Sequence, residues 1–338
     1  MRKLSVFFMG ITASFLITLN GLPISKYTAK ADLPTQVYVG GMSAGFTLQS
    51  GNVQVVGLCE VMTESGVLAP ALKAGIRSGD KIIKVAGIRV KTIEELNDII
   101  HKNSNKTIEI VFQRGDCEQS LSLTAVKDKI SGRYKIGILA RDSISGIGTV
   151  TYINAENGRF GSLGHSVINE SKERLQISKG TVYECNIVGV NKGIRGKAGE
   201  LKGMFMGDQT LGTAEKVCES GIFGQISQSF TVSELMKTVA DSNDVIPGKA
   251  YIYSTVNGVS PKKYEIEIVK VDKYNKDHKN YVLKIVDREL IAETGGIVQG
   301  MSGSPILQDG KLIGAVTHVF LNDPTRGYGI DIQTMLKE

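Results

Sequence analysis

From residue 136 on, the chain carries short apolar runs that alternate with polar positions, separated by turn-forming residues. Alternation with a period of two is typical of β-strands that bury one face. Asn157-Gly158 favours a hairpin between two of these runs. One stretch, 233–241, instead suggests a short helix. The pattern predicts a β-barrel or sandwich with strands near 136–140, 148–153, 181–190, 221–226, 249–254, 263–271 and 281–286.

The preceding part of the chain shows helices between strands. Pro70 and Gly75 are placed to begin and end a short helix. Thr92 followed by Glu95 is a capping box, which predicts a helix over 93–102. We therefore predict a small α/β domain at 32–126, a polar linker at 127–135 and an all-β domain at 136–338.

The first 31 residues are typical of a targeting segment. Arg2 and Lys3 precede an uncharged, mostly apolar run over 4–19. Ala29-Lys30-Ala31 is a candidate cleavage site of the small-x-small type. The run is short for a bilayer span, although a signal-anchor could use it. We expect a signal peptide or signal-anchor that contacts the membrane, with the rest of the chain exported.

Composition narrows the function classes. The 338 residues are 41% hydrophobic and 22% charged, which is typical of a globular protein. The net charge is only +6, and no dense basic cluster with aromatics occurs, so we expect no nucleic-acid partner. The four cysteines form no Cys-x-x-Cys pair, so we expect no metal and no other cofactor. Unpaired thiols are the favoured interpretation, although export would permit disulfides.

The segment Gly300–Pro305, Gly-Met-Ser-Gly-Ser-Pro, carries the main candidate chemistry. A nucleophilic serine needs an exposed hydroxyl beside backbone N–H groups that stabilise an oxyanion, and small neighbours let a substrate approach. Ser302 meets these needs, with the N–H groups of Gly300 and Ser302 as the oxyanion hole. A tight turn is the alternative interpretation, and Ser304 is the first alternative nucleophile.

His165 is the favoured general base among the four histidines, because it follows a hairpin in a glycine-rich corner early in the β region. Asp287, at the end of an apolar strand, is the favoured carboxylate to orient it, ahead of Asp142 and Asp208. His318 lies on a strand soon after Ser302. It is a candidate for the S1 pocket, which holds the side chain before the scissile bond, or else a core residue.

The α/β domain resembles a PDZ domain of the bacterial type. The resembling residues are the loop Ser43-Ala44-Gly45-Phe46 and the stretch 74–87, with Ala-Gly-Ile, Gly-Asp and Ile-Ile in sequence. The resemblance implies that the loop N–H groups of Ser43, Ala44, Gly45 and Phe46 hold a peptide carboxylate. A purely structural domain is the alternative.

Three further motifs resemble the SpoIVB peptidase, stage IV sporulation protein B. They are Gly161-x-Leu163-Gly164-His165, Thr294–Pro305 and Gly314–Pro324. That family has an N-terminal membrane segment, a PDZ domain and a chymotrypsin-clan serine peptidase domain. The resemblance covers essentially the whole chain and implies a mainly β fold with a chymotrypsin-like double β-barrel. It maps the catalytic residues onto His165, Asp287 and Ser302.

The resemblance also implies a role in endospore formation. The protein would be exported to the forespore membrane and the intermembrane space. There it would cleave its own chain and a membrane-bound regulator of an intramembrane protease, which triggers sigma-factor precursor processing in the mother cell. Met301 departs from trypsin-like enzymes, which carry an aspartate there, so a charge-pair zymogen switch is not expected.

Two other functions compete with this one. A non-catalytic PDZ adaptor would need neither His165 nor Ser302. A quality-control protease of the HtrA type would place its PDZ domain after the peptidase, which is the opposite of the order expected here.

Overall fold

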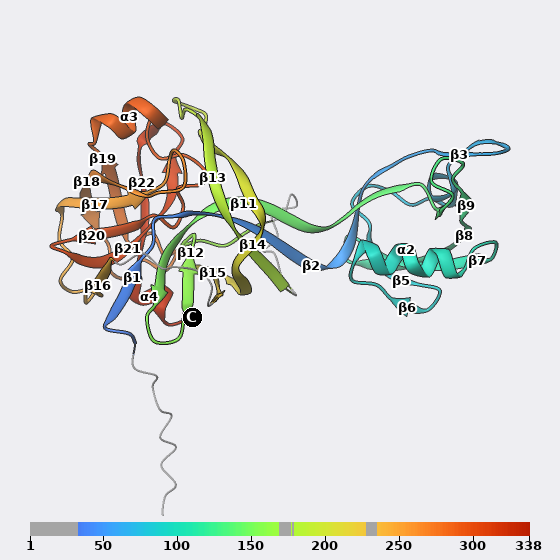
Figure 1. The fold of residues 1–338 in the computed structure, drawn as a ribbon, viewed down its shortest axis with the longest axis horizontal. Coiled ribbons are helices and arrows are strands. Elements are labelled where there is room, and N and C mark those ends of the chain that lie inside the picture. Colours follow the sequence, from blue (N-terminus) through green and yellow to red (C-terminus); the bar gives the residue numbers. More distant parts are fainter. Residues whose placement is uncertain (1–32, 169–176, 178, 228–234) are drawn as a thin grey trace, which may run out of the picture. The chain divides into compact units, whose positions relative to one another are not determined.

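The computed structural model describes residues 33–168, 177, 179–227 and 235–338 (Figure 1). The predicted signal or anchor segment at 1–31 lies outside this range. None of the helices in the described residues is long and apolar enough to cross a membrane.

The α/β part matches the predicted order of elements. Thr92 caps helix α2, because its side chain accepts a hydrogen bond from the N–H of Glu95, and Gly75 ends α1 with a φ of 94°. Both predicted helices are therefore confirmed. The elements are β3 (Val61–Thr63), β4 (Gly66–Leu68), α1 (Pro70–Ala74), β5 (Lys81–Val85), β6 (Ile88–Arg89), α2 (Ile93–Lys102), β7 (Thr107–Arg114), β8 (Cys117–Thr124), β9 (Val126–Lys127) and β10 (Tyr134–Lys135).

Two long strands, β2 (Ser43–Leu58) and β11 (Ile138–Asn154), belong to both parts of the chain. Residues 138–141 of β11 pair antiparallel with 54–58 of β2, and β2 continues to pair with β5. The α/β domain thus takes a strand from the segment that follows it. The other halves of both strands pair within the β region.

Six strands of the β region form a ring, which we call the first ring. Pairing runs from β11 to β12, β15, β14, β13 and β2, and β2 pairs with β11 to close it. Its core contains Phe46, Val150, Phe160 and Leu163. The strands not yet defined are β12 (Arg159–Ser162), β13 (Lys179–Asn191), β14 (Glu200–Cys218) and β15 (Gly221–Ile226), and β1 (Gln36–Val39) and β16 (Met236–Thr238) pair alongside.

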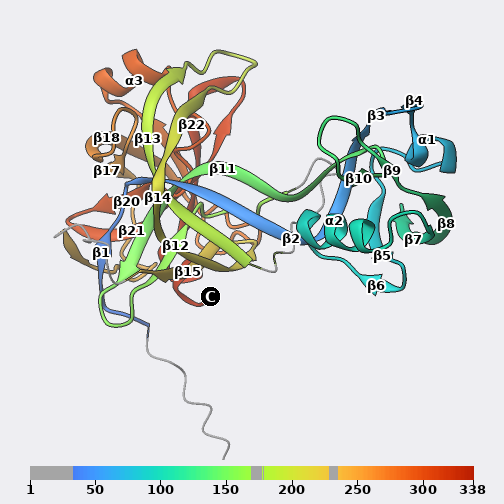
Figure 2. The same ribbon diagram turned by 45° about the vertical axis from the view of Figure 1, so that its right-hand side comes forward.

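The last six strands close a second barrel in the order β17-β18-β19-β22-β21-β20 (Figure 2). Apolar side chains such as Ile252, Leu283 and Ile306 fill it. The expected mainly β architecture is confirmed. The elements are β17 (Gly248–Ser254), β18 (Lys262–Val271), β19 (Tyr281–Ile285), α3 (Arg288–Thr294), β20 (Pro305–Gln308), β21 (Lys311–Phe320), β22 (Asp323–Asp331) and α4 (Ile332–Leu336).

The helix suggested at 233–241 is wrong for the described residues of that stretch. Met236–Thr238 forms β16, and Met236 pairs with Tyr38 of β1. Pairing with a strand about two hundred positions earlier overrides the local pattern, because tertiary contacts outweigh weak intrinsic propensity.

Candidate active site

The turn that carries Ser302 is built from glycines and is tied to the first ring. Gly300 and Gly303 have φ values of 99° and 95°, a region that favours glycine. The N–H of Thr149 donates to the carbonyl of Ser302 at 2.9 Å, and the Thr149 hydroxyl donates to the carbonyl of Gly300 at 2.8 Å. A Cβ on Gly303 would clash with the Thr149 carbonyl oxygen. The glycines therefore let the turn lie directly against β11.

The two serines of this turn have different surroundings. Ser302 is half-buried and lines a cavity. Ser304 has no exposed surface, and its hydroxyl is hydrogen-bonded to that of Ser254 at 3.0 Å. A nucleophile must be reached by its substrate, so this arrangement favours Ser302 over Ser304.

The backbone N–H groups of Gly300 and Ser302 are available. Within the described residues neither donates a hydrogen bond to a protein acceptor, whereas the intervening N–H of Met301 donates to the Val298 carbonyl at 3.1 Å. Both residues line the cavity. Unused N–H groups beside a serine hydroxyl are what an oxyanion hole requires. Met301 itself is fully buried in the second barrel, so its side chain belongs to the core.

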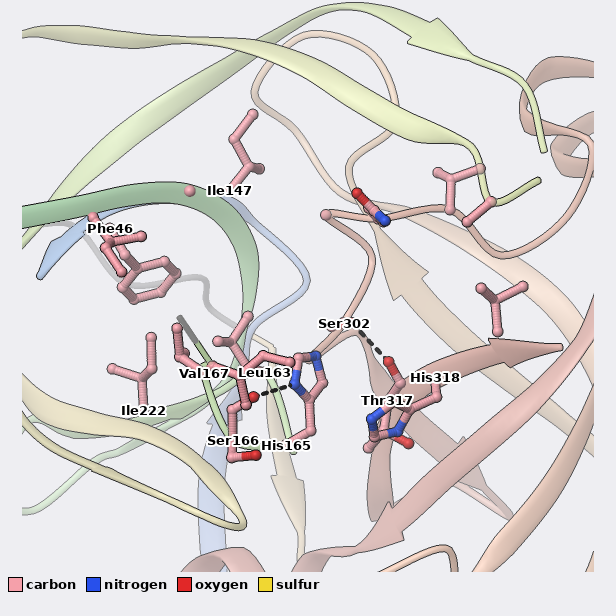
Figure 3. A pocket seen from close by; sticks show the side chains of 18 of the residues that line it. Phe46, Ile147, Leu163, His165, Ser166, Val167, Ile222, Ser302, Thr317 and His318 are labelled. Carbon is pink, nitrogen blue, oxygen red and sulfur yellow. Dashed lines mark hydrogen bonds between the residues drawn. The ribbon is translucent and has the colours of Figure 1, made fainter. Parts of the chain in front are cut away.

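His165 comes from a tight corner that follows β12. Leu163 and Gly164 both adopt positive φ, 67° and 70°. A Cβ on Gly164 would come within 2.9 Å of side-chain carbons of Ile330 and Thr317, so the corner packs closely on the second barrel. This packing places the His165 ring 4.8 Å from the ring of His318, measured between centroids (Figure 3).

The environment of His165 suits a general base. Its Nδ1 lies 2.9 Å from the carbonyl oxygen of Ser166. Because a carbonyl oxygen only accepts, the proton sits on Nδ1 and the lone pair is on Nε2. Desolvation lowers the pKa of His165, partly offset by the bond to Ser166, which keeps the imidazole neutral at neutral pH.

Ser302 and His165 share the cavity without a direct hydrogen bond. The Ser302 hydroxyl donates instead to the carbonyl oxygen of Thr317 at 2.7 Å (Figure 3). Catalytic hydrogen bonds often form only when substrate is bound, so this contact describes a resting arrangement.

Asp287 does not meet His165 in the structure. It is the N-cap of α3, where one carboxylate oxygen accepts from the N–H of Leu290 at 3.0 Å and the other from the N–H of Glu265 at 3.3 Å. Of the rivals, Asp142 accepts from the N–H of Ile93 at the start of α2, and the side chain of Asp208 is outside the described part of the structure. None of the described cavity residues carries a carboxylate.

The cavity measures about 610 Å³, within the range of ligand pockets. Its walls are largely apolar, with Phe46, Leu163, Val298 and Val319 among them. His318 lines it as well, as the S1 interpretation requires. Desolvation, then repulsion by His165 and Lys279, lowers the pKa of His318.

The interpretation of Ser43-Ala44-Gly45-Phe46 as a carboxylate-binding loop is wrong. These residues lie in β2 and pair with both β11 and β13. Ala44 and Phe46 are buried in the first ring, and the Ser43 hydroxyl donates to the Thr255 carbonyl at 3.1 Å. Their N–H groups belong to a strand, because the chain enters the β region before it reaches the α/β domain.

Sequence reasoning also missed three groups that shape the site. These are Thr149, which holds the turn that carries Ser302, and the carbonyl oxygens of Ser166 and Thr317. A backbone carbonyl leaves no signal in residue type. Only the neighbouring sequence marks them, since Ser166 follows His165 and Thr317 precedes His318.

The closed second barrel beside the first ring, with a glycine-flanked serine and a histidine in one cavity, resembles the chymotrypsin-like fold of serine peptidases. A family model described as SpoIVB peptidase S55 matches residues 132–336, and a PDZ domain model matches 66–114. The chain therefore belongs to the SpoIVB peptidase S55 family and carries a PDZ domain.

Individual proteins resemble the chain over smaller parts or more weakly. "Probable protease eep" of Enterococcus faecalis (strain ATCC 700802 / V583) is 30% identical over 71 residues, which is 20% of this chain and 17% of that protein. The chain thus spans about a sixth of that relative. The PDZ domain of an SdrC-like protein from Listeria monocytogenes is 24% identical with a TM-score of 0.21, covering 26% of this chain and 90% of that one. Human heparin binding protein is 11% identical with a TM-score of 0.28, covering 54% and 80%.

Proposed function

We propose that the chain is a serine endopeptidase in which Ser302 is the nucleophile and His165 the general base. The observation that carries this proposal is the shared cavity, where the Ser302 hydroxyl, a neutral His165 and the free N–H groups of Gly300 and Ser302 lie together. The proposed base comes from the first ring and the proposed nucleophile from the second barrel. A chymotrypsin-like double barrel distributes its catalytic residues in the same way.

The chemistry follows from these positions. His165 Nε2 takes the proton of Ser302 as its hydroxyl attacks the substrate carbonyl, and the N–H groups of Gly300 and Ser302 stabilise the oxyanion. The hydroxyl must first turn from the Thr317 carbonyl toward His165, because its hydrogen bond points elsewhere in the resting arrangement. The Ser166 carbonyl holds Nδ1–H in the position that an aspartate occupies in the usual triad.

The apolar cavity next to Ser302 is the proposed S1 pocket, and His318 is its polar member. We expect cleavage after a medium-sized apolar residue, with His318 shaping that preference. Replacing His318 by Ala should change the profile of cleaved residues in a peptide library. If the variant keeps full activity and an unchanged profile, His318 takes no part in substrate recognition.

Membership of the SpoIVB peptidase S55 family supports a proposal about the substrates. We propose that the chain is exported to the forespore membrane, cleaves itself near its N-terminus and cleaves a membrane-bound regulator of an intramembrane protease during sporulation. The PDZ domain would bind peptide segments of these proteins. Because residues 43–46 are part of a strand, any such binding uses other residues of the domain.

Complementation of a deletion strain tests this cellular role. We expect the deletion strain to form no spores and to show no sensitivity to heat during growth. The wild-type chain should restore spore formation, and a chain with Ser302→Ala should not. Heat sensitivity with normal sporulation would instead point to quality control. Rescue by the Ser302→Ala chain would favour an adaptor that needs no catalysis.

A further inference from the structure

Two imidazole rings from different parts of the fold meet in the cavity. His165 follows β12 of the first ring and His318 lies on β21 of the second barrel. Their ring centroids are 4.8 Å apart with planes inclined by 41° (Figure 3). Rings this close can offer one nitrogen each to a single ion, since zinc–imidazole bonds measure about 2.0–2.1 Å.

The hydrogen bonding of His165 is the kind that prepares a metal ligand. In metal sites the second ring N–H of a histidine is usually donated to a carbonyl or carboxylate, which fixes the tautomer and the ring orientation. The Nδ1–H of His165 is donated in this way to the Ser166 carbonyl at 2.9 Å, so the Nε2 lone pair is free for a ligand.

No ion pair inside the described cavity competes with a metal ion for the two rings. None of the cavity residues described in the structure is Asp, Glu, Lys or Arg, so no ion pair engages either ring there. The positive charge of Lys279 repels a positive charge at His318 and therefore weakens the binding of any cation there.

We propose that His165 and His318 bind a zinc-class transition-metal ion and that this ion inhibits the peptidase. The described residues contain no group of three or more His, Cys, Asp or Glu, so solvent completes the coordination and binding is reversible. The ion would occupy His165 Nε2, the atom that must accept the proton of Ser302. The inhibitory part of this proposal rests on the proposed function, whereas metal binding does not.

The first experiment measures peptide hydrolysis by the full chain as zinc chloride is increased into the micromolar range. We expect inhibition that EDTA reverses, and none from Mg²⁺ or Ca²⁺, because hard cations prefer oxygen ligands. His318→Gln should raise the zinc concentration for half-inhibition by about tenfold or more, relative to its own activity without metal. His278→Gln, a histidine outside the cavity, should leave that concentration unchanged.

The second experiment needs no catalysis. Titration calorimetry of zinc into the full chain with Ser302→Ala should show one site, and adding His318→Gln should abolish it or weaken it by about tenfold or more. Equal zinc binding with and without His318 would overturn the proposal, as would equal inhibition of both enzymes. A chain that binds zinc through His318 but hydrolyses no peptide keeps the metal site and refutes the proposed peptidase function.

Discussion

Ser302→Ala is expected to abolish both self-cleavage and the hydrolysis of an added unfolded protein substrate. Removing the serine of such a site lowers kcat by about 10⁴-fold or more, because the covalent step is lost and only binding and oxyanion stabilisation remain. The fold should survive, since Ser302 makes its side-chain contact with one backbone carbonyl and is half-buried. Time courses with purified chains, followed by gel and by a fluorescent peptide, measure the loss.

Ser304→Ala is the matched control for this prediction. Ser304 is two residues away, fully buried and hydrogen-bonded to Ser254, so its loss should affect stability by about 1 kcal/mol and leave cleavage largely intact. The opposite result, with Ser302→Ala active and Ser304→Ala inactive, would show that the nucleophile had been assigned to the wrong serine.

Local signals were sufficient for much of this architecture. Thr92 with Glu95, Pro70 with Gly75 and the alternating strands 249–254, 263–271 and 281–286 all appear as predicted. Each depends on neighbours within a few positions or on one buried face, so the sequence records it directly. Glycines around Ser302 and His165 marked both as site candidates, and the structure places both in one cavity, while their catalytic roles stay a prediction.

Features that depend on distant partners could not be predicted in this way. The α/β domain takes residues 138–141 as a strand although they follow the domain, while Ser43–Phe46 precede it and belong to the first ring. Residue type alone cannot show which sheet an apolar strand joins. Residue type is equally uninformative for Asp287. An aspartate just before a helix can cap that helix as readily as it can orient a histidine.

The Ser166 carbonyl beside His165 and the role of Asp287 as the N-cap of α3 both bear on how the site is controlled. His165 is oriented by a backbone group in its own corner, and Ser302 is turned toward Thr317. In the proposed mechanism, the step toward activity is a local reorientation of the Ser302 hydroxyl. Met301 is buried in an apolar core, so no buried ion pair at that position accompanies it.

His165→Ala is expected to lower kcat by about 10⁴-fold or more, because no other described cavity residue except His318 can accept the proton of Ser302. In the wild-type chain the base acts when it is neutral, so activity rises with pH through the pKa of His165. Desolvation lowers that pKa, so the acid limb of the kcat/KM profile should lie below the ordinary histidine value of about 6.5. Profiles recorded with EDTA present measure this limb without metal effects.

Asp287→Asn tests whether Asp287 orients His165 or only caps α3, because the two roles predict different losses of activity. An asparagine retains an acceptor for the N–H of Leu290, so the cap should survive and kcat should fall by less than about tenfold. A triad carboxylate changed to its amide would instead cost about 10⁴-fold in kcat, since the imidazole then adopts the wrong tautomer. A loss of that size, together with a shifted acid limb, would show that Asp287 reaches His165 in the substrate complex and that the Ser166 carbonyl only holds the resting enzyme.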